Sequence, residues 1–123
     1  MSKKTVLIID DEPDFVEMIR MRLESNDYNV LEAFDGETGY ETAKKDQPGL
    51  ILLDIMMPKL DGFGTLRKLK GDEETDGINV VMLTAKGEST AIFKAQGLGA
   101  NDYLLKPCDP DDLQAAVQKF CRA

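Results

Sequence analysis

The most constraining feature of this sequence is the alternation of short apolar runs with longer stretches of helical periodicity. The runs cover residues 5–9, 28–33, 50–53, 78–83 and 103–105. The third run, LILL, is apolar throughout, which is typical of a strand that is buried on both faces of a sheet. We therefore predict five β-strands at these positions.

Between and after these runs, apolar residues recur at the three- and four-residue spacing of an amphipathic helix. The pattern is shorter around 63–69 and 91–98 and least regular around Tyr40 and Ala43. Pro13 and the pair Asp109-Pro110 suit the first turn of a helix. The clearest apolar faces are Phe15, Met18, Ile19 and Leu23 in the first stretch and Leu113, Ala116, Val117 and Phe120 in the last.

Strict alternation of strands and helices predicts the architecture of the chain. Strands that are separated by helices run parallel, their crossovers are right-handed, and the helices cover both faces of the sheet. The fold class is therefore α/β, with a single doubly wound sheet. The chain has 123 residues and no recognisable linker or internal repeat, so we expect one domain over 1–123.

Composition excludes several classes of function. A formal net charge of −8 argues against direct binding of nucleic acid or of an anionic membrane. No segment approaches the ~20 apolar residues of a membrane span. The chain lacks histidine, which excludes Ser–His and Cys–His catalytic pairs and most zinc sites. Cys108 and Cys121 lack metal-ligand spacing and are expected to be reduced, so we expect a cytoplasmic protein without membrane insertion.

Polar residues follow four of the five predicted strands. Asp10 and Asp11 follow the first run, Asp54 the third, Thr84 the fourth and Lys106 the fifth. Each of these residues could have a purely structural role. Asp10-Asp11 before Glu12-Pro13, for example, fits the cap of a helix. Because the carboxyl ends of parallel strands meet at one edge of a sheet, however, we expect these side chains to lie together.

This combination of residue types favours phosphoryl chemistry that depends on a hard metal ion. Three carboxylates at one edge repel one another unless a cation lies among them, and an all-oxygen site favours Mg²⁺. A hydroxyl and an ammonium group beside them could bind a phosphoryl group. A carboxylate can itself be the nucleophile that accepts this group, which yields an aspartyl phosphate.

Four motifs identify a family. They are LIIDDEP at 7–13, LILLDIMMPKLDG at 50–62, VMLTA at 81–85 and LGANDYLLKP at 98–107. In their order and spacing, over essentially the whole chain, the sequence resembles the receiver (CheY-like) domain of two-component response regulators. The resemblance implies a flavodoxin-like (βα)5 fold with a five-stranded parallel sheet of order 2-1-3-4-5. It also implies a receiver domain over 1–123 with no output domain present.

The resemblance implies specific roles for the residues at the strand ends. Asp54 would be the phospho-acceptor, with the phosphohistidine of a sensor histidine kinase or of a phosphotransfer protein as the donor. Asp10, Asp11 and Asp54 would bind Mg²⁺ together with the backbone carbonyl of Met56. Lys106 would pair with the phosphoryl oxygens.

The resemblance also implies a conformational switch. Thr84 would turn its hydroxyl toward the phosphoryl group, and Tyr103 would rotate into the vacated space. The surface of the fourth helix, fifth strand and fifth helix would then control a partner protein, with the domain monomeric or dimeric on phosphorylation. Such a domain is a signalling protein rather than an enzyme, although it would catalyse its own phosphorylation and slow dephosphorylation. The Lys106–Pro107 peptide bond would be cis.

Some residues depart from the family pattern or leave room for an alternative. Cys108 lies where the family often has phenylalanine, and Met56 and Lys86 lie where side chains can control the hydrolytic water. An alternative function is an aspartyl-phosphate phosphohydrolase, but those enzymes usually have an acid two residues after the nucleophile, where this chain has Met56. The acidic turn at 71–77 is predicted to be a solvated loop, since an EF-hand register would place Leu83 at the position of the bidentate glutamate.

Overall fold

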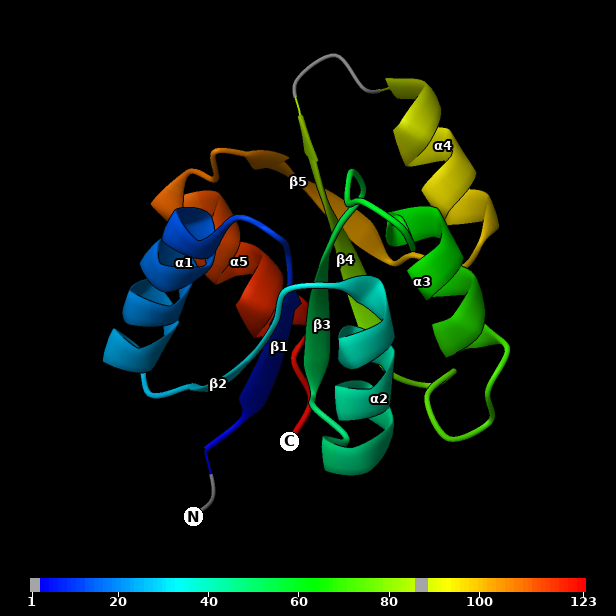
Figure 1. Cartoon of the computed structure of the whole chain (residues 1–123). Helices are drawn as coiled ribbons and strands as arrows, with labels where there is room; N and C mark the ends of the chain where they lie inside the picture. Colours follow the sequence, from blue (N-terminus) through cyan, green and yellow to red (C-terminus); the bar gives the residue numbers. More distant parts are fainter. Residues whose placement is uncertain (1–2, 86–88) are drawn as a thin grey trace.

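A computed structural model describes residues 3–85 and 89–123, which form a sheet flanked by helices (Figure 1). The helices and strands alternate along the chain, as the periodicity predicted. The strands are β1 (Thr5–Ile9), β2 (Asn29–Ala33), β3 (Leu50–Asp54), β4 (Asn79–Ala85) and β5 (Asp102–Lys106). The helices are α1 (Pro13–Ser25), α2 (Gly36–Asp46), α3 (Gly62–Lys70), α4 (Ser89–Gly97) and α5 (Pro110–Phe120).

The sheet has the order β2-β1-β3-β4-β5, and each strand is parallel to its neighbours. Both the doubly wound α/β fold class and the strand order implied by the family resemblance are therefore confirmed. The central strand is β3, and every residue from Leu50 to Leu53 has an exposed fraction of 0%. The continuous apolar run in the sequence thus reflects a strand with helices on both of its faces.

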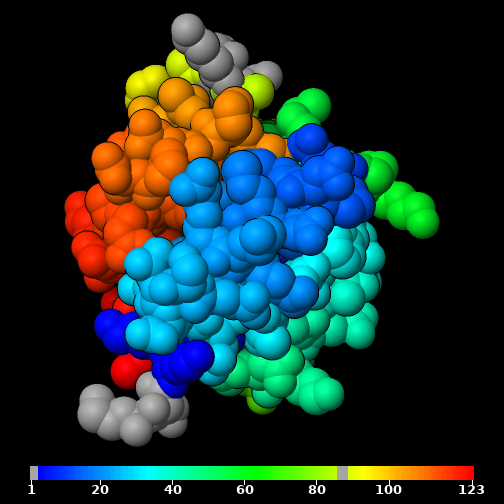
Figure 2. Space-filling model, turned by 90° about the vertical axis from the view of Figure 1, so that its left-hand side faces the viewer, coloured from blue at the N-terminus to red at the C-terminus, as the bar shows by residue number. Residues whose placement is uncertain are grey.

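The sheet separates two hydrophobic cores. On one face, alternate strand residues such as Ile8 and Leu52 pack with the apolar sides of α1 and α5, which lie next to each other in Figure 2. On the other face, Leu7, Ile9 and Leu53 pack with buried residues of α2, α3 and α4. Because successive strand residues point to opposite faces, one apolar strand supplies both cores.

Three helices begin with an aspartate that caps the helix. Asp35, Asp61 and Asp109 each accept a hydrogen bond from a backbone N–H two or three residues further on, at 2.7–2.8 Å. Helix α1 begins differently, since Glu12 precedes Pro13 and makes no side-chain capping bond within the described residues. Among the helices that the structure describes, none combines the length and the apolar character needed to cross a membrane.

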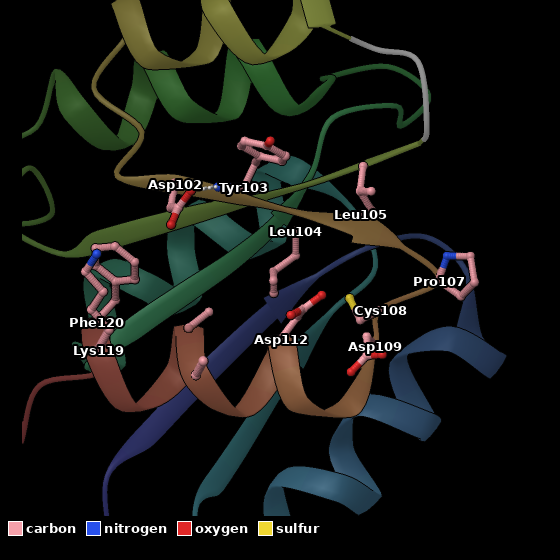
Figure 3. Close-up of a pocket in the computed structure, with 12 residues that line it drawn as sticks. Asp102, Tyr103, Leu104, Leu105, Pro107, Cys108, Asp109, Asp112, Lys119 and Phe120 are labelled. Carbon is pink, nitrogen blue, oxygen red and sulfur yellow. Dashed lines mark hydrogen bonds between the residues drawn. The ribbon is translucent and has the colours of Figure 1, made fainter.

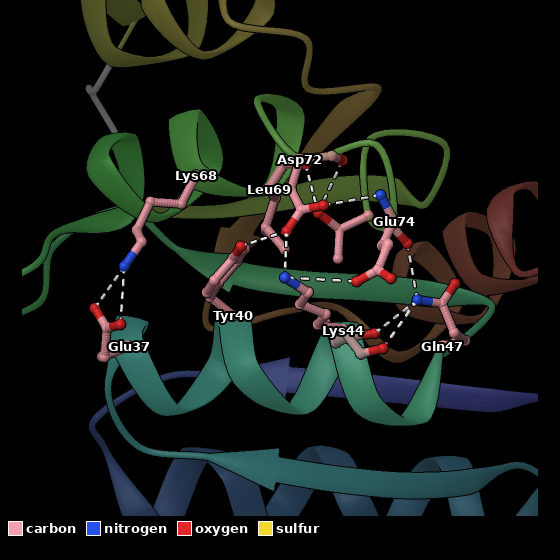
Figure 4. A network of polar contacts seen from close by, with 10 residues as sticks. Glu37, Tyr40, Lys44, Gln47, Lys68, Leu69, Asp72 and Glu74 are labelled. Carbon is pink, nitrogen blue, oxygen red and sulfur yellow. Dashed lines mark hydrogen bonds and ion pairs between the residues drawn. The ribbon is translucent and has the colours of Figure 1, made fainter.

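The acidic turn between α3 and β4 is partly tied to α2 (Figure 4). The Tyr40 hydroxyl donates a hydrogen bond to the carboxylate of Asp72, and Lys44 Nζ lies 3.1 Å from that carboxylate. The hydrogen bond from Tyr40 contributes most to lowering the pKa of Asp72, to about 2. Thr75 is 1% exposed and donates to the Leu69 carbonyl oxygen at 2.6 Å. The prediction of a solvated loop is therefore wrong for Asp72 and Thr75, because contacts with α2 and α3 anchor them.

Both cysteines are free thiols, in agreement with the sequence-based expectation. Cys108 is half-buried beside the core between α1, α5 and the sheet, and Cys121 is buried within it. Burial raises the pKa of Cys108 to about 11 and also raises that of Cys121. Both thiols therefore remain protonated near neutral pH and act as small apolar side chains.

The loop that follows β3 packs closely against the end of that strand at Gly62. The Gly62 N–H donates to the Ile55 carbonyl oxygen at 2.9 Å. A Cβ atom on Gly62 would lie 2.3 Å from the backbone oxygen of Asp54 and 2.6 Å from the Cα atom of Ile55. The start of α3 therefore lies directly against Asp54, and only a residue without a side chain permits this contact.

We expect Gly62→Ala to lower the free energy of unfolding by about 1–3 kcal/mol, because backbone must move to admit the methyl group. Urea unfolding measures this change. Gly77→Ala is the matched control, since its added Cβ would have no atom within 4 Å, and it should change the free energy by less than about 0.5 kcal/mol. Equal effects of the two substitutions would show that the contact at Gly62 does not constrain the loop.

Candidate functional site

The candidate residues lie at the carboxyl edge of the sheet. Asp54 is the last residue of β3, Lys106 is the last residue of β5, and Thr84 is the last but one of β4. Asp10 directly follows β1, and its backbone N–H donates to the Ala33 carbonyl oxygen of β2 at 3.0 Å. The parallel sheet thus delivers side chains from four strands to one edge.

Four carboxylates come together at this edge. Asp10, Asp11, Glu12 and Asp54 each offer an oxygen, and these oxygens all lie within 4.8 Å of one another. Asp10 has an exposed fraction of 0% and Asp54 of 5%. Carboxylate oxygens in such a cluster are ligands that Mg²⁺ and Ca²⁺ prefer. We refer to these four residues as the acidic cluster.

Lys106 contacts the acidic cluster with its ammonium group. Its Nζ atom lies 2.9 Å from Asp10 Oδ2 and 3.7 Å from Asp54 Oδ2, and it also donates a hydrogen bond to Glu12 Oε1. The same atom lies 4.6 Å from the centre of the Phe15 ring, a cation–π distance. The Lys106–Pro107 peptide bond is cis, as the family resemblance implied.

The pKa values of these groups reflect burial and an excess of negative charge. Burial, and secondly the charge of Asp10, raise the pKa of Asp54 to about 7. Burial also raises the pKa of Asp10, although the hydrogen bond from Lys106 opposes this. For Lys106, burial alone would lower the pKa, but hydrogen bonds to Glu12 and Asp10 outweigh it and raise the pKa. One ammonium group therefore does not compensate the acidic cluster, and a bound cation would.

A pocket of about 370 Å³ opens beside Asp54. Thr84 and Ala85 line this pocket. Thr84 is only 2% exposed, and its hydroxyl donates to the Ala85 carbonyl oxygen at 3.4 Å. Met56 forms part of the rim and is 68% exposed, while its backbone N–H donates to Asp54 Oδ1 at 3.3 Å. The pocket thus offers space for a small group directly next to the Asp54 carboxylate.

Tyr103 is the one candidate that the structure places elsewhere (Figure 3). It lies on the edge strand β5 and is 40% exposed. This strand borders a groove of about 520 Å³ toward α5, and the Tyr103 ring lies on the opposite side of the strand. In the sheet register Tyr103 pairs with Met82, whereas Thr84 pairs with Leu105. In this conformation the Tyr103 ring therefore lies outside the pocket that Thr84 and Asp54 share.

Two contacts of the site were not predicted from the sequence. Glu12 joins the acidic cluster and pairs with Lys106, whereas the sequence suggested only a place at the start of a helix. Phe15 packs against the core, as its spacing predicted, and its ring also contacts Lys106. The position of Glu12 directly after two aspartates was an available signal. Lys86, which the sequence placed near the hydrolytic water, lies outside the described residues.

The fold and the site together define a class of protein. A flavodoxin-like sheet of order 2-1-3-4-5, with an acidic cluster at its carboxyl edge, is the architecture of CheY-like signalling domains. The family model for the response regulator receiver domain matches residues 6–118. The chain therefore belongs to the receiver domain family of two-component response regulators, as its motifs suggested.

Individual relatives agree with this assignment. The DNA-binding dual master transcriptional regulator RpaA of Synechocystis sp. is 42% identical over 117 residues, which cover 95% of this chain and 48% of RpaA. The chemotaxis protein CheY4 of Vibrio cholerae has a TM-score of 0.90 at 25% identity, covering 96% of this chain and 98% of that one. This chain spans about half the length of the curated relatives that it matches.

A further solved structure bears on the acidic cluster. The receiver domain of the sensor histidine kinase PA1611 from Pseudomonas aeruginosa PAO1 has a TM-score of 0.88 at 28% identity, covering 96% of this chain and 97% of that one. That crystal structure has a magnesium ion coordinated in its active-site cleft. The carboxylates of this chain are the kind of ligand that such an ion takes.

The raised pKa of Asp54 predicts that stability falls as pH rises. The folded protein binds this proton more tightly than the unfolded chain does between about pH 4 and pH 7, so ionisation of Asp54 weakens folding in that window when no metal is present. In EDTA, the free energy of unfolding of Asp54→Asn relative to that of the wild type should therefore increase between pH 5 and pH 8, by on the order of 2 kcal/mol. Urea unfolding across this range measures the gain.

The control for this prediction is Asp46→Asn, which removes an exposed carboxylate from the end of α2. Its stability relative to the wild type should stay nearly constant across the same range. A gain for Asp54→Asn that does not depend on pH would contradict the assignment of the raised pKa to Asp54.

Proposed function

We propose that Asp54 accepts a phosphoryl group and that the chain is a phosphorylation-activated switch of a two-component phosphorelay. The observation that carries this proposal is the position of Asp54: a buried carboxylate at the end of the central strand, next to an open pocket and 3.7 Å from the Lys106 ammonium group. A rigid sheet keeps this carboxylate in one orientation, which a nucleophile in phosphoryl transfer requires.

The donor is proposed to be a phosphohistidine on a sensor histidine kinase or a phosphotransfer protein, since this chain has no histidine of its own. An ionised Asp54 oxygen would attack the phosphorus atom, so that an O–P bond forms while the P–N bond breaks and its electron pair returns to the imidazole. The product on this chain is an aspartyl phosphate, a mixed anhydride.

Asp10, Asp11 and Asp54 would bind Mg²⁺ through their carboxylates, and the backbone carbonyl of Met56 would add a further oxygen. Support comes from the acidic cluster of four carboxylates, in which one ammonium group contacts three. When bound, Mg²⁺ neutralises the charge on the phosphoryl oxygens and on the carboxylates. It would also favour the ionised form of Asp54, whose pKa is raised in the metal-free protein.

Two side chains of the pocket would bind the transferred group. Lys106 is proposed to pair with a phosphoryl oxygen, because its ammonium group already lies next to Asp54. Thr84 would turn its hydroxyl from the Ala85 carbonyl to a second phosphoryl oxygen; its present hydrogen bond is long, at 3.4 Å, and therefore weak. Ala85 leaves space for that oxygen because its side chain is small.

Phosphorylation of Asp54 is proposed to change the surface formed by α4, β5 and α5, and this change would be the signal that the domain transmits. Movement of Thr84 would leave space on the inner side of β5, and Tyr103, which is 40% exposed, would rotate inward to fill it. Such a change is a shift between two conformations that exist before phosphorylation. The altered surface would control a partner protein or pair with a second phosphorylated copy; with a net charge of −8, direct contact with nucleic acid is not proposed.

We further propose that 1–123 functions as one receiver domain whose enzymatic activity is limited to its own phosphorylation and dephosphorylation. Met56 at the pocket rim would influence access of the hydrolytic water. A phosphohydrolase would need an acid near that position to protonate a leaving group, and Met56 supplies none.

The first test of the proposal is the intact mass of the protein after incubation with acetyl phosphate. We expect the wild type to gain one phosphoryl group when Mg²⁺ is present and none in EDTA. Asp54→Asn should gain none under either condition, while Asp46→Asn should behave as the wild type does. A full gain of mass in Asp54→Asn would show that another residue is the acceptor.

A second test addresses the metal. Mg²⁺ at 10 mM should raise the melting temperature of the wild type by roughly 5 °C, because the ion binds the folded chain and relieves repulsion among the carboxylates. Asp11→Ala should lose most of this increase, whereas Asp14→Ala, which removes an exposed acid in the first turn of α1, should retain it. A normal response of Asp11→Ala would place the metal site elsewhere.

A further inference from the structure

Lys106 has more partners than a phosphate-binding lysine needs. Its ammonium group donates hydrogen bonds to Asp10 and Glu12, lies over the ring of Phe15, and stays 3.7 Å from Asp54. A lysine has three N–H donors, so two of them are already used in this conformation. The shortest contacts direct the ammonium group toward the start of α1 and not toward the proposed phospho-acceptor.

Glu12 differs from the other partners of Lys106 in its exposure. The side chain of Glu12 is 63% exposed, whereas that of Asp10 is fully buried. A buried carboxylate that lost its ammonium partner would be strongly destabilised, so the pair of Lys106 with Asp10 is expected to persist. An exposed carboxylate can return to water at little cost. Glu12 is therefore the partner that Lys106 can exchange.

No other described contact explains the orientation of Glu12. It occupies the N-cap position of α1 but makes no side-chain capping bond within the described residues, and Pro13 follows it in the first turn. Helix α1 thus does not depend on the Glu12 carboxylate, and the ion pair with Lys106 accounts for where that carboxylate lies.

We propose that Glu12 is a positioning residue that keeps Lys106 away from Asp54 in the unphosphorylated protein and competes with the phosphoryl group for the lysine. This inference rests on the proposed function, in which Lys106 pairs with a phosphoryl oxygen of modified Asp54. Formation of the active state then moves the ammonium group toward the phosphoryl oxygen and away from the Glu12 carboxylate. Glu12 stabilises the unphosphorylated conformation by the free energy of the ion pair between its carboxylate and Lys106.

A different role of Glu12 predicts the opposite result. Its carboxylate belongs to the acidic cluster, so it could instead be a metal ligand. Removal of a ligand would weaken binding of Mg²⁺ and, through the metal, binding of a phosphoryl group. Removal of a competitor would strengthen binding of a phosphoryl group and leave Mg²⁺ affinity nearly unchanged. The sign of the effect therefore distinguishes the two roles.

The test uses Glu12→Gln, which preserves the shape of the side chain and removes its charge. The dissociation constant of beryllofluoride, an analogue of the phosphoryl group, is measured by calorimetry at saturating Mg²⁺, and that of Mg²⁺ is measured alone. We expect Glu12→Gln to bind beryllofluoride about two- to fivefold more tightly than the wild type, the effect of a partly exposed ion pair. Its Mg²⁺ affinity should stay within about twofold of the wild type.

Two controls separate this role from a change in net charge or in folding. Asp14→Asn removes one charge from the first turn of α1, and Asp14 makes no ion pair among the described residues, so its beryllofluoride affinity should match the wild type. Glu12→Asp retains the charge on a shorter side chain and should fall between Glu12→Gln and the wild type. The gain in Glu12→Gln should also shrink at high salt, which screens an exposed pair.

The outcomes are distinct. Unchanged or weaker beryllofluoride binding by Glu12→Gln, with normal binding by the wild type, would overturn the role of Glu12 and leave the proposed function intact. Loss of Mg²⁺ affinity by Glu12→Gln would reassign Glu12 as a metal ligand. Failure of the wild type to bind beryllofluoride or to accept a phosphoryl group would overturn the inference together with the proposed function.

Discussion

The ion pair between Lys106 and Asp10 joins two parts of the chain that are 96 residues apart, and the rest of the site depends on it. Asp10 is fully buried, and a carboxylate in that position needs a positive partner or a proton. Strands β1 and β5 are not neighbours in the sheet, so the long lysine side chain reaches across the carboxyl edge. On that path it meets Asp54 and Glu12, and one ammonium group links three of the four carboxylates.

This arrangement leaves the site short of positive charge. The pKa of Asp54 is raised to about 7 because the carboxylate is buried near another carboxylate, and Lys106 compensates only in part. A protein selected for stability alone would replace such a cluster with apolar residues. Under the proposed function the unfavourable charge has a use, since a bound metal ion and a phosphoryl group would each relieve or redistribute charge that the fold has already brought together.

The rest of the fold explains why the protein can tolerate the repulsion among these carboxylates. Strand β3 is central and its residues before Asp54 are fully buried, with a hydrophobic core on each face of the sheet. Gly62 brings the start of α3 against Asp54, and Asp61 caps that helix. Core packing on both faces thus supplies the stability that the acidic cluster removes, and the groups that are proposed to move, Glu12, Thr84 and Tyr103, belong to neither core.

The sequence by itself determined the alternation of five strands and five helices, and hence the parallel doubly wound sheet, because hydrophobic periodicity depends on local spacing. It also placed Asp10, Asp11, Asp54, Thr84 and Lys106 at strand ends, which a parallel sheet must bring to one edge. Only the tertiary structure decided which side chains touch: Glu12 and Phe15 at Lys106, Tyr40 at Asp72, and Tyr103 outside the pocket. These contacts join residues far apart in the chain through long side chains, and no periodic pattern in the sequence records where such side chains meet.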